Sequence, residues 1–242
     1  MYIKNRNKIL IGFLSFALLF ALVIKPTTFV KGETTQDNQP DPSGKTFLYQ
    51  QLGLEALGLS RAAFQYALNG WDKLMKEGKI KKDNILSILD FSLPSGEKRL
   101  FVIDLELGKL LFNTYASHGK NSGAIVPTRF SNRQNSNQSS LGFYITGDVY
   151  SGKHGPSLRL EGKEDGINDN AFNRGIVLHG ADYADENVAR KRGYIGRSLG
   201  CPAVPPRLTG PIIQKIKEGS CLFIYSPDPS YLRKSTIAAA NS

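Results

Sequence analysis

The sequence predicts a mainly β domain that follows a short helical N-terminal segment and carries one or two peripheral helices. Three observations predict this fold. Apolar residues recur at helical spacing only near positions 61–76 and 208–217. From Ile85 onward the chain instead shows short apolar runs separated by turn residues, the pattern of strands. Long loops rich in Gly and Asn join these runs, and such loops commonly carry function on a rigid scaffold.

The first 32 residues have the features of a secretory signal peptide. Three basic residues precede an apolar run from Ile9 to Ile24, which ends at Lys25 and Pro26. This run of 16 residues is shorter than the ~20 that span a bilayer, and the residues before Gly32 fit cleavage after that glycine. We therefore expect an exported protein of the periplasm or cell envelope, with no membrane span in its mature form. An uncleaved N-terminal anchor is the alternative.

The next segments are a polar stretch and a helical region. Residues 33–45 are rich in Pro, Asp, Ser and Gly, which predicts a flexible linker. Residues 46–82 form the predicted helical segment, with a short helix over 52–58 and a longer one over 61–76. Ser60 is the expected N-cap of the longer helix, and Gly78 ends its apolar pattern.

Residues 83–228 form the predicted β-rich domain. Strands are expected over 85–91, 100–104 and 109–115, the last two as a hairpin, and over 143–146, 176–178 and 222–225. A peripheral helix is expected over 208–217, where Ile212, Ile213 and Ile216 share one face. Residues 229–242 are assigned to a C-terminal tail.

The charge of the chain is mildly basic once the signal segment is set aside. The formal net charge is +10 at pH 7, but residues 1–32 hold five basic and no acidic residues, which leaves +5. Such a bias suits an anionic envelope polymer or membrane surface. No basic stretch contains interleaved aromatic residues, so nucleic-acid binding is not expected.

The two cysteines, Cys201 and Cys221, allow two interpretations. In an oxidising compartment they could form the one possible intramolecular disulfide. Cys221, however, begins an apolar run that ends at Tyr225, and a free cysteine in a buried strand behaves as a small hydrophobe. The residues alone leave a disulfide and two free thiols equally open.

A cysteine and a histidine have the pattern of a nucleophile and its base. Cys201 lies in the motif SLGCP at positions 198–202, and His179 ends an apolar run 22 residues upstream. Because the thiolate is the attacking species, His179 is the candidate that takes its proton and later protonates a leaving amine. Gly200 permits a tight turn, and the N–H groups of Gly200 and Cys201 are candidate oxyanion donors. Ser198 orients His179, contributes to substrate binding, or caps the turn.

Further motifs accompany this pair in a fixed order: ASHGK at 116–120, SN at 131–132, SSLGFY at 139–144, KHG at 153–155, LRLEG at 158–162 and RGIVLHGADY at 174–183. With these motifs the chain resembles the L,D-transpeptidase catalytic domain (YkuD-like) family, in particular its murein L,D-transpeptidase catalytic domain branch. The resemblance extends from about Ile85 to Tyr225 and does not cover the N-terminal helical segment.

The resemblance implies a β-sandwich-like catalytic domain that acts on peptidoglycan stem peptides. It implies that Cys201 attacks the bond between a diamino acid and the following D-alanine of a stem tetrapeptide, with His179 as base. The thioester acyl-enzyme would then be resolved by the amine of a neighbouring stem. The same resemblance favours two unpaired thiols. The candidate substrate-binding residues are His118, Ser139, Ser140, Arg159, Arg174, Gly180 and Arg197. Between the two histidines in Gly-flanked loops, His118 is expected to line the cleft in preference to His154.

Two positions depart from the family pattern. Leu199 stands where most of the wider family has histidine, and Pro202 to Pro205 stand where an arginine follows the cysteine. Arg174 and Arg197 are candidates to replace that arginine, because guanidinium can brace carbonyl groups. These departures bear on the acyl acceptor more than on the thiol chemistry.

No metal site or cofactor is expected. Three scattered histidines without paired ligand spacing do not predict a metal site, and the Gly-rich loops lack a phosphate-binding pattern. Three functions remain: a cysteine L,D-transpeptidase, an L,D-carboxypeptidase that uses water as acceptor, and a non-catalytic envelope-binding module with a Cys201–Cys221 disulfide.

Overall fold

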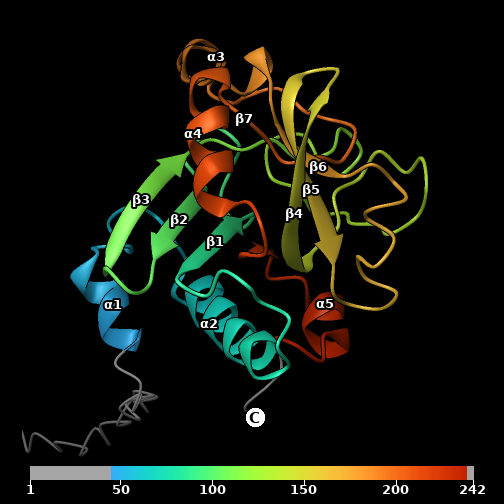
Figure 1. Cartoon of the computed structure of the whole chain (residues 1–242). Helices are drawn as coiled ribbons and strands as arrows, with labels where there is room; N and C mark the ends of the chain where they lie inside the picture. Colours follow the sequence, from blue (N-terminus) through green and yellow to red (C-terminus); the bar gives the residue numbers. More distant parts are fainter. Residues whose placement is uncertain (1–44, 239–242) are drawn as a thin grey trace, which may run out of the picture. The chain divides into compact units, whose positions relative to one another are not determined.

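The computed structural model describes residues 45–238 (Figure 1). The predicted signal peptide over 1–32 and nearly all of the predicted linker lie outside the described residues. Within residues 45–238, no helix is both long enough and apolar enough to cross a membrane.

One eight-stranded sheet organises the fold, in the order β3-β2-β1-β8-β4-β5-β6-β7. Neighbouring strands are antiparallel except for the parallel pairs β1–β8 and β6–β7. The strands are β1 Ile85–Asp90, β2 Leu100–Asp104, β3 Lys109–Thr114, β4 Gly142–Gly152, β5 Gly155–Gly162, β6 Val177–Gly180, β7 Ala203–Val204 and β8 Cys221–Tyr225. This architecture confirms the mainly β prediction, including the β2–β3 hairpin. The long β4–β5 hairpin was underestimated, because residues 147–162 alternate without a continuous apolar run.

The sheet is surrounded by short helices: α1 Lys45–Gln51, α2 Arg61–Lys76, α3 Glu186–Arg192, α4 Pro206–Ile216 and α5 Pro229–Lys234, together with the 3-10 helix η1 Asp182–Ala184. The predicted α2 is confirmed, and Ser60 caps it by accepting the N–H of Ala63 at 3.2 Å. The helix predicted over 52–58 is wrong. Those residues form turns after α1, because Gly53 and Gly58 adopt positive φ values of 59° and 88°.

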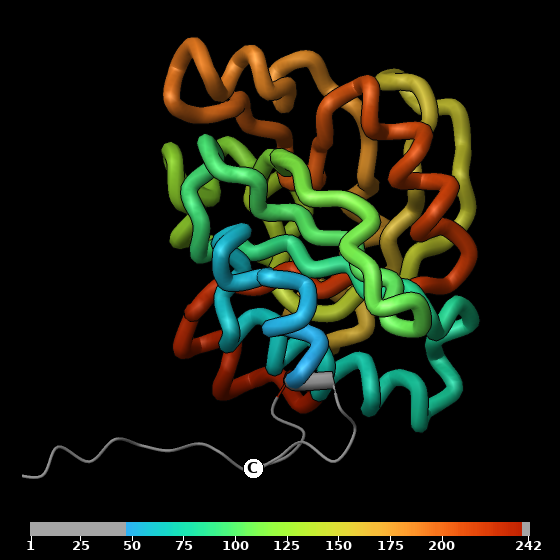
Figure 2. Tube along the Cα trace, turned by 90° about the vertical axis from the view of Figure 1, so that its left-hand side faces the viewer, coloured from blue at the N-terminus to red at the C-terminus, as the bar shows by residue number. Residues whose placement is uncertain are grey.

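The helix α2 packs directly on the centre of the sheet through Gly70. A Cβ at Gly70 would lie 2.0 Å from the ring of Phe143, which itself stacks on Phe223 at 4.2 Å. Glycine inside a helix costs about 1 kcal/mol relative to alanine, but here it permits close contact between helix and sheet. Figure 2 shows the blue-to-teal helices and the red C-terminal end together below the strands.

The predicted C-terminal tail is instead packed against the core as far as the described chain extends. Tyr231 and Ile237 are buried, and Lys73 on α2 donates to the Thr236 carbonyl at 2.8 Å. The buried carboxylate of Glu164 accepts hydrogen bonds from Tyr231 Oη at 3.1 Å and from Ser235 Oγ. The sequence did not indicate this because the stabilising partner lies 67 positions away.

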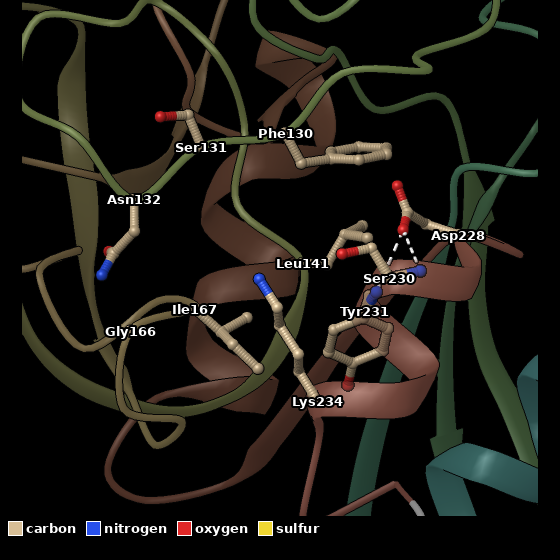
Figure 3. A pocket seen from close by; sticks show the side chains of 10 residues that line it. All are labelled: Phe130, Ser131, Asn132, Leu141, Gly166, Ile167, Asp228, Ser230, Tyr231 and Lys234. Atoms are coloured by element: carbon tan, nitrogen blue, oxygen red, sulfur yellow. Dashed lines mark hydrogen bonds between the residues drawn. The ribbon is translucent and has the colours of Figure 1, made fainter.

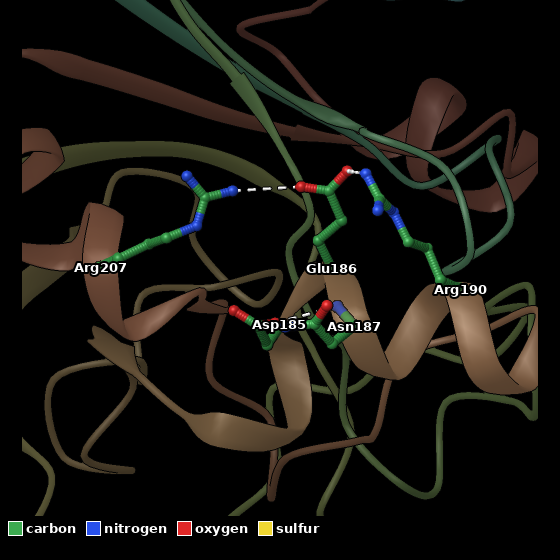
Figure 4. Close-up of polar contacts among 5 residues, drawn as sticks. All are labelled: Asp185, Glu186, Asn187, Arg190 and Arg207. Atoms are coloured by element: carbon green, nitrogen blue, oxygen red, sulfur yellow. Dashed lines mark hydrogen bonds and ion pairs between the residues drawn. The ribbon is translucent and has the colours of Figure 1, made fainter.

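The helices α3 and α4 are joined at the surface beyond the end of β6 (Figure 4). Asp185 caps α3 by accepting the N–H of Asn187 at 2.9 Å. The carboxylate of Glu186 contacts Arg190 at 2.9 Å and Arg207 on α4 at 3.2 Å. Such exposed ion pairs contribute only about 0.2–1 kcal/mol each.

Candidate active site

The Cys201 loop (residues 197–202) runs from the end of α3 towards β7 and places the thiol at the surface of a cavity. Gly200 has a φ of +133°, a region that disfavours side chains, and a Cβ there would lie 2.8 Å from the Gln138 carbonyl oxygen. Ser198 Oγ accepts the N–H of Gly200 at 3.0 Å and donates to the Cys201 carbonyl at 2.6 Å. Ser198 therefore caps the turn, which was the least specific of its predicted roles.

This turn changes the prediction for the oxyanion site. The N–H of Gly200 is already bonded to Ser198 Oγ, so it is not a free donor for an oxyanion. The N–H of Cys201 interacts with its own sulfur and is hydrogen-bonded to no other described residue. The geometry therefore leaves the Cys201 amide as the available donor and does not support Gly200.

The thiol of Cys201 is half-buried and unpaired. Its Sγ donates to the Gly175 carbonyl at 3.6 Å. Burial raises the pKa of this thiol, while the Val177 backbone and the Arg174 guanidinium act in the opposite direction. At rest the sulfur is therefore protonated, and a base must remove its proton before or during attack.

His179 has the geometry of a neutral base. It lies on β6, opposite Ser157 of β5 and Ala203 of β7. Its Nδ1 lies 2.9 Å from the Gly180 carbonyl oxygen, which can only accept, so Nδ1 carries the hydrogen and Nε2 is left free to take a proton. Burial lowers the pKa of His179, the Gly180 carbonyl raises it, and His154 lowers it. The ring is therefore neutral at pH 7.

Cys201 and His179 line the same cavity of about 410 Å³. No hydrogen bond joins Sγ of Cys201 to the imidazole; the thiol is directed at the Gly175 carbonyl instead. The expected thiol–imidazole hydrogen bond is thus absent at rest. Catalytic hydrogen bonds are often loose in unliganded enzymes. The other lining residues are Tyr150, Lys153, His154, Ser157, Arg174, Gly175, Ile176, Val177, Tyr183, Arg197, Ser198 and Leu199.

The structure reverses the expected roles of the two other histidines. His154, in the turn of the β4–β5 hairpin, stacks on His179 with ring centroids 4.7 Å apart and an interplanar angle of 20°. His118 is fully buried and does not line the cavity. The sequence signal for His154 was present, since it lies between the two glycines that define the hairpin turn, but nothing local showed which element this turn would cover.

The remaining predicted substrate-binding residues fall into two groups. Arg174 and Arg197 line the cavity and brace carbonyl groups: Arg174 donates to Ser131 O at 2.7 Å and Gln138 O at 2.6 Å, and Arg197 donates to Gly123 O at 3.1 Å. The other four residues, Ser139, Ser140, Arg159 and Gly180, do not line this cavity.

Each of these four has a different place. Ser139 and Ser140 are buried behind the cavity, where Ser139 Oγ donates to the Gly200 carbonyl at 3.0 Å. Arg159 is exposed and stacks over Tyr150 at 4.6 Å. Gly180 lines a neighbouring cavity of about 390 Å³ that His154 also borders. The sequence missed Tyr183, whose half-buried side chain lines the thiol cavity and whose only signal was its place in the RGIVLHGADY motif.

A third cavity, of about 150 Å³, lies beside α5 (Figure 3). Lys234 points into it between Ile167 and Leu141, and Asp228 is occupied in capping α5. This cavity holds neither a cysteine nor a histidine, so the thiol cavity is the candidate active site. Over residues 45–238, no group of three His, Cys, Asp or Glu side chains could hold a metal ion.

The disulfide alternative disagrees with the structure. Both cysteines are free, and Cys221 is fully buried on β8, between β1 and β4 at the centre of the sheet. Cys201 instead lines the cavity at the sheet margin. The envelope-binding module that depended on this disulfide loses its main support.

Comparisons with known proteins give distant structural likenesses and one family match. The chain is similar to an L,D-transpeptidase from Mycobacterium smegmatis at 14% identity and a TM-score of 0.38, with 59% of each chain covered. It is also similar to an L,D-transpeptidase from Stackebrandtia nassauensis at 13% identity and a TM-score of 0.36, with 77% of this chain and 78% of that chain covered. The chain thus spans about three-fifths of the Mycobacterium smegmatis protein. No curated protein matches it in sequence.

The family model described as L,D-transpeptidase catalytic domain matches residues 55–225, more than half of the 242 residues. The match begins before α2, so the expectation that the resemblance excludes the helical segment is wrong. The chain belongs to the L,D-transpeptidase catalytic-domain family.

Proposed function

We propose that this protein is a cysteine-dependent L,D-transpeptidase that acts on peptidoglycan stem tetrapeptides. The observation that carries the proposal is the cavity that Cys201 and His179 share. Nδ1 of His179 is bonded to the Gly180 carbonyl, so its Nε2 is free to accept a proton. Family membership supplies the reaction class, and the geometry supplies a nucleophile and a base for it.

The proposed first half-reaction forms a thioester. Nε2 of His179 removes the thiol proton as Sγ of Cys201 attacks the carbonyl carbon of the diamino acid residue. The Cys201 N–H stabilises the oxyanion, and the cations Arg174 and Arg197 at the cavity wall favour the negative charge. When the C–N bond breaks, the imidazolium returns the proton to the amine of the departing D-alanine.

The second half-reaction transfers the acyl group. The amine of a neighbouring stem attacks the thioester carbon, and His179 takes the proton that the amine loses. The C–S bond then breaks, and the sulfur recovers the proton from the imidazolium, so that a new amide and a free thiol result. Water in place of the amine would give a carboxypeptidase.

Intact-protein mass spectrometry with a synthetic stem tetrapeptide tests the thioester. We expect an adduct with the mass of the tripeptidyl acyl group on the parent protein and on Cys221→Ala, and none on Cys201→Ala. An adduct on Cys201→Ala would exclude the proposal. Product analysis with an added acceptor stem then separates the two acceptors, since crosslinked dimers indicate transpeptidation and tripeptide stems indicate hydrolysis.

We also propose that the protein is exported to the periplasm or cell envelope, since its proposed substrate lies there and residues 1–32 have the pattern of a signal peptide. Fractionation of cells that produce the full chain, compared with a chain lacking residues 1–32, tests this. Equal retention of both chains in the cytosol would contradict export.

A further inference from the structure

Arg99 is a buried cation immediately before β2. Its side chain is fully buried, and its three donor groups are all satisfied: Nε donates to Ala116 O at 2.9 Å, one terminal nitrogen to Leu93 O at 3.0 Å, and the other to the His118 ring at 2.8 Å. Burial lowers the pKa of Arg99 to about 9, so the guanidinium remains charged at pH 7. No carboxylate among the described residues is hydrogen-bonded to it.

The bond to Arg99 fixes the state of His118. Because guanidinium can only donate, Nδ1 of His118 must accept, and the ring is therefore neutral with its hydrogen on Nε2. That Nε2 lies 3.3 Å from the Gly123 carbonyl oxygen, to which it donates. Burial and the charge of Arg99 lower the pKa of His118 to about 3. Because Nδ1, the only basic nitrogen of this ring, is occupied by Arg99 and the ring does not line the thiol cavity, His118 cannot act as a base for the reaction.

Hydrogen bonds join segment 116–120 to the Cys201 loop and to the first residue of β7. Ser198 N–H donates to the His118 carbonyl at 2.9 Å, and Lys120 N–H donates to the Ser198 carbonyl at 2.8 Å. Ser117 Oγ donates to the Cys201 carbonyl at 3.3 Å and accepts the N–H of Ala203 at 3.0 Å. The segment 116–120 therefore lies beside the loop and holds it on both sides of the cysteine.

We propose that Arg99 and His118 are positioning residues, which hold segment 116–120 and through it set the place of the Cys201 thiol. This inference rests on the proposed role of Cys201. Next to the cysteine this chain has Leu199 and a Pro-rich stretch, which cannot donate side-chain hydrogen bonds to the loop. We assign the support of the loop to the buried pair instead. Arg174 and Arg197 brace the loops on the cavity side, whereas Arg99 braces the side that faces the core.

The test measures the thiol directly, so that it does not depend on the transpeptidase activity. All variants carry Cys221→Ala, which leaves one cysteine, and the alkylation rate by iodoacetamide is followed from pH 6 to 10. The key pair is His118→Phe, which removes the acceptor for Arg99, and His118→Asn, whose Oδ1 can replace Nδ1 as acceptor. Glu164→Gln is the control, since it perturbs a buried network that joins α5 to β4 and makes no hydrogen bond to segment 116–120 or to the Cys201 loop.

We expect His118→Phe to release the loop and hydrate the thiol. Burial raises the pKa of the thiol in the parent, so hydration lowers this pKa and the alkylation midpoint moves to lower pH. The alkylation rate at pH 7 should rise by roughly tenfold, because the loss of one charge-assisted hydrogen bond shifts the equilibrium between held and released loop by about that factor. Acylation by the tetrapeptide falls by a similar factor. We expect His118→Asn to stay within about twofold of the parent, and Glu164→Gln to lower the melting temperature without moving the midpoint.

An unchanged alkylation midpoint in folded His118→Phe would overturn the inference, as would an equal shift in Glu164→Gln. If His118→Phe does not fold, Ser117→Ala takes its place, since it removes the hydroxyl that bonds to the Cys201 carbonyl and to the N–H of Ala203. An unchanged midpoint in Ser117→Ala would then overturn the inference equally. Absence of acylation in the parent, with the expected alkylation shifts intact, would reject the proposed function and leave the positioning role standing.

Discussion

The two cysteines of this chain occupy opposite environments. Cys221 lies on β8 at the centre of the sheet, with Leu86 of β1 and Ile145 of β4 as its cross-strand neighbours. Its side chain is fully buried, and burial raises the pKa of its thiol strongly. Cys201 lies in a loop and lines a cavity together with His179 and two arginines. Reactivity therefore depends on what surrounds each thiol, because both residues have the same intrinsic chemistry.

The sharpest test of this difference is selective alkylation of the native protein. We expect iodoacetamide to modify Cys201 faster than Cys221 by on the order of 1,000-fold or more, since Cys221 reacts only when the sheet opens. Peptide mapping after timed quenching gives both rates. Both thiols should react at similar rates in denaturant, and comparable rates in the native protein would show that β8 is not stable.

Substitution of Gly200 is expected to have the next largest effect. The new Cβ of Gly200→Ala would lie too close to Gln138 O, and residue 200 has a φ of +133°, which alanine disfavours. The Cys201 loop must therefore move. We expect acylation to fall by roughly 100-fold or more, as misplaced nucleophiles do.

The matched control for this substitution is Gly210→Ala on α4, where a Cβ would meet nothing within 4 Å. In a helix this change should stabilise the fold by about 0.5–1 kcal/mol and leave acylation unchanged. A similar loss of acylation in both variants would show that the loop geometry at Gly200 is not decisive.

The stacked His154 should shift the pH dependence of acylation by a smaller amount. His154→Ala exposes His179 to water and removes a repulsion, so the pKa of His179 rises towards its ordinary value of about 6.5. Because His179 must be neutral to act as base, the acidic limb of the rate profile should move to higher pH, by up to about one unit.

His154→Phe is the informative partner, since it keeps the stacked ring but not the ionisable group. We expect its acidic limb to move less than that of His154→Ala. If neither variant moves the limb, the contact between the two rings has no role in setting the base.

Cys221→Ala should have the smallest effect on the thiol chemistry and a measurable effect on stability. Loss of the buried sulfur leaves a small cavity, which we expect to lower the free energy of unfolding by about 1–2 kcal/mol. Urea unfolding measures the loss, and acylation at Cys201 should match the parent. A parallel loss of acylation would mean that β8 and the Cys201 loop are coupled.

Local sequence patterns predicted a strand or helix well where its apolar residues form a continuous run or a regular helical stripe. The strands β1, β2 and β8 and the helix α2 follow from such runs, and Ser60 marks the start of α2. The β4–β5 hairpin and α5 were missed because β4 and β5 leave much of their surface exposed and α5 is held by Glu164. Contacts at long sequence separation leave no periodic trace in the chain.

The sequence by itself determined the chemistry that this protein can carry: a thiol after a glycine, a histidine at a strand end, and the motifs of one family. Only the tertiary structure decided which of these groups are free to react. It left Nε2 of His179 free, bonded the Gly200 amide to Ser198, brought His154 rather than His118 to the base, and kept Cys221 away from Cys201. The physical reason is that burial and hydrogen bonds set protonation and access, and both arise from segments that meet only in the folded chain.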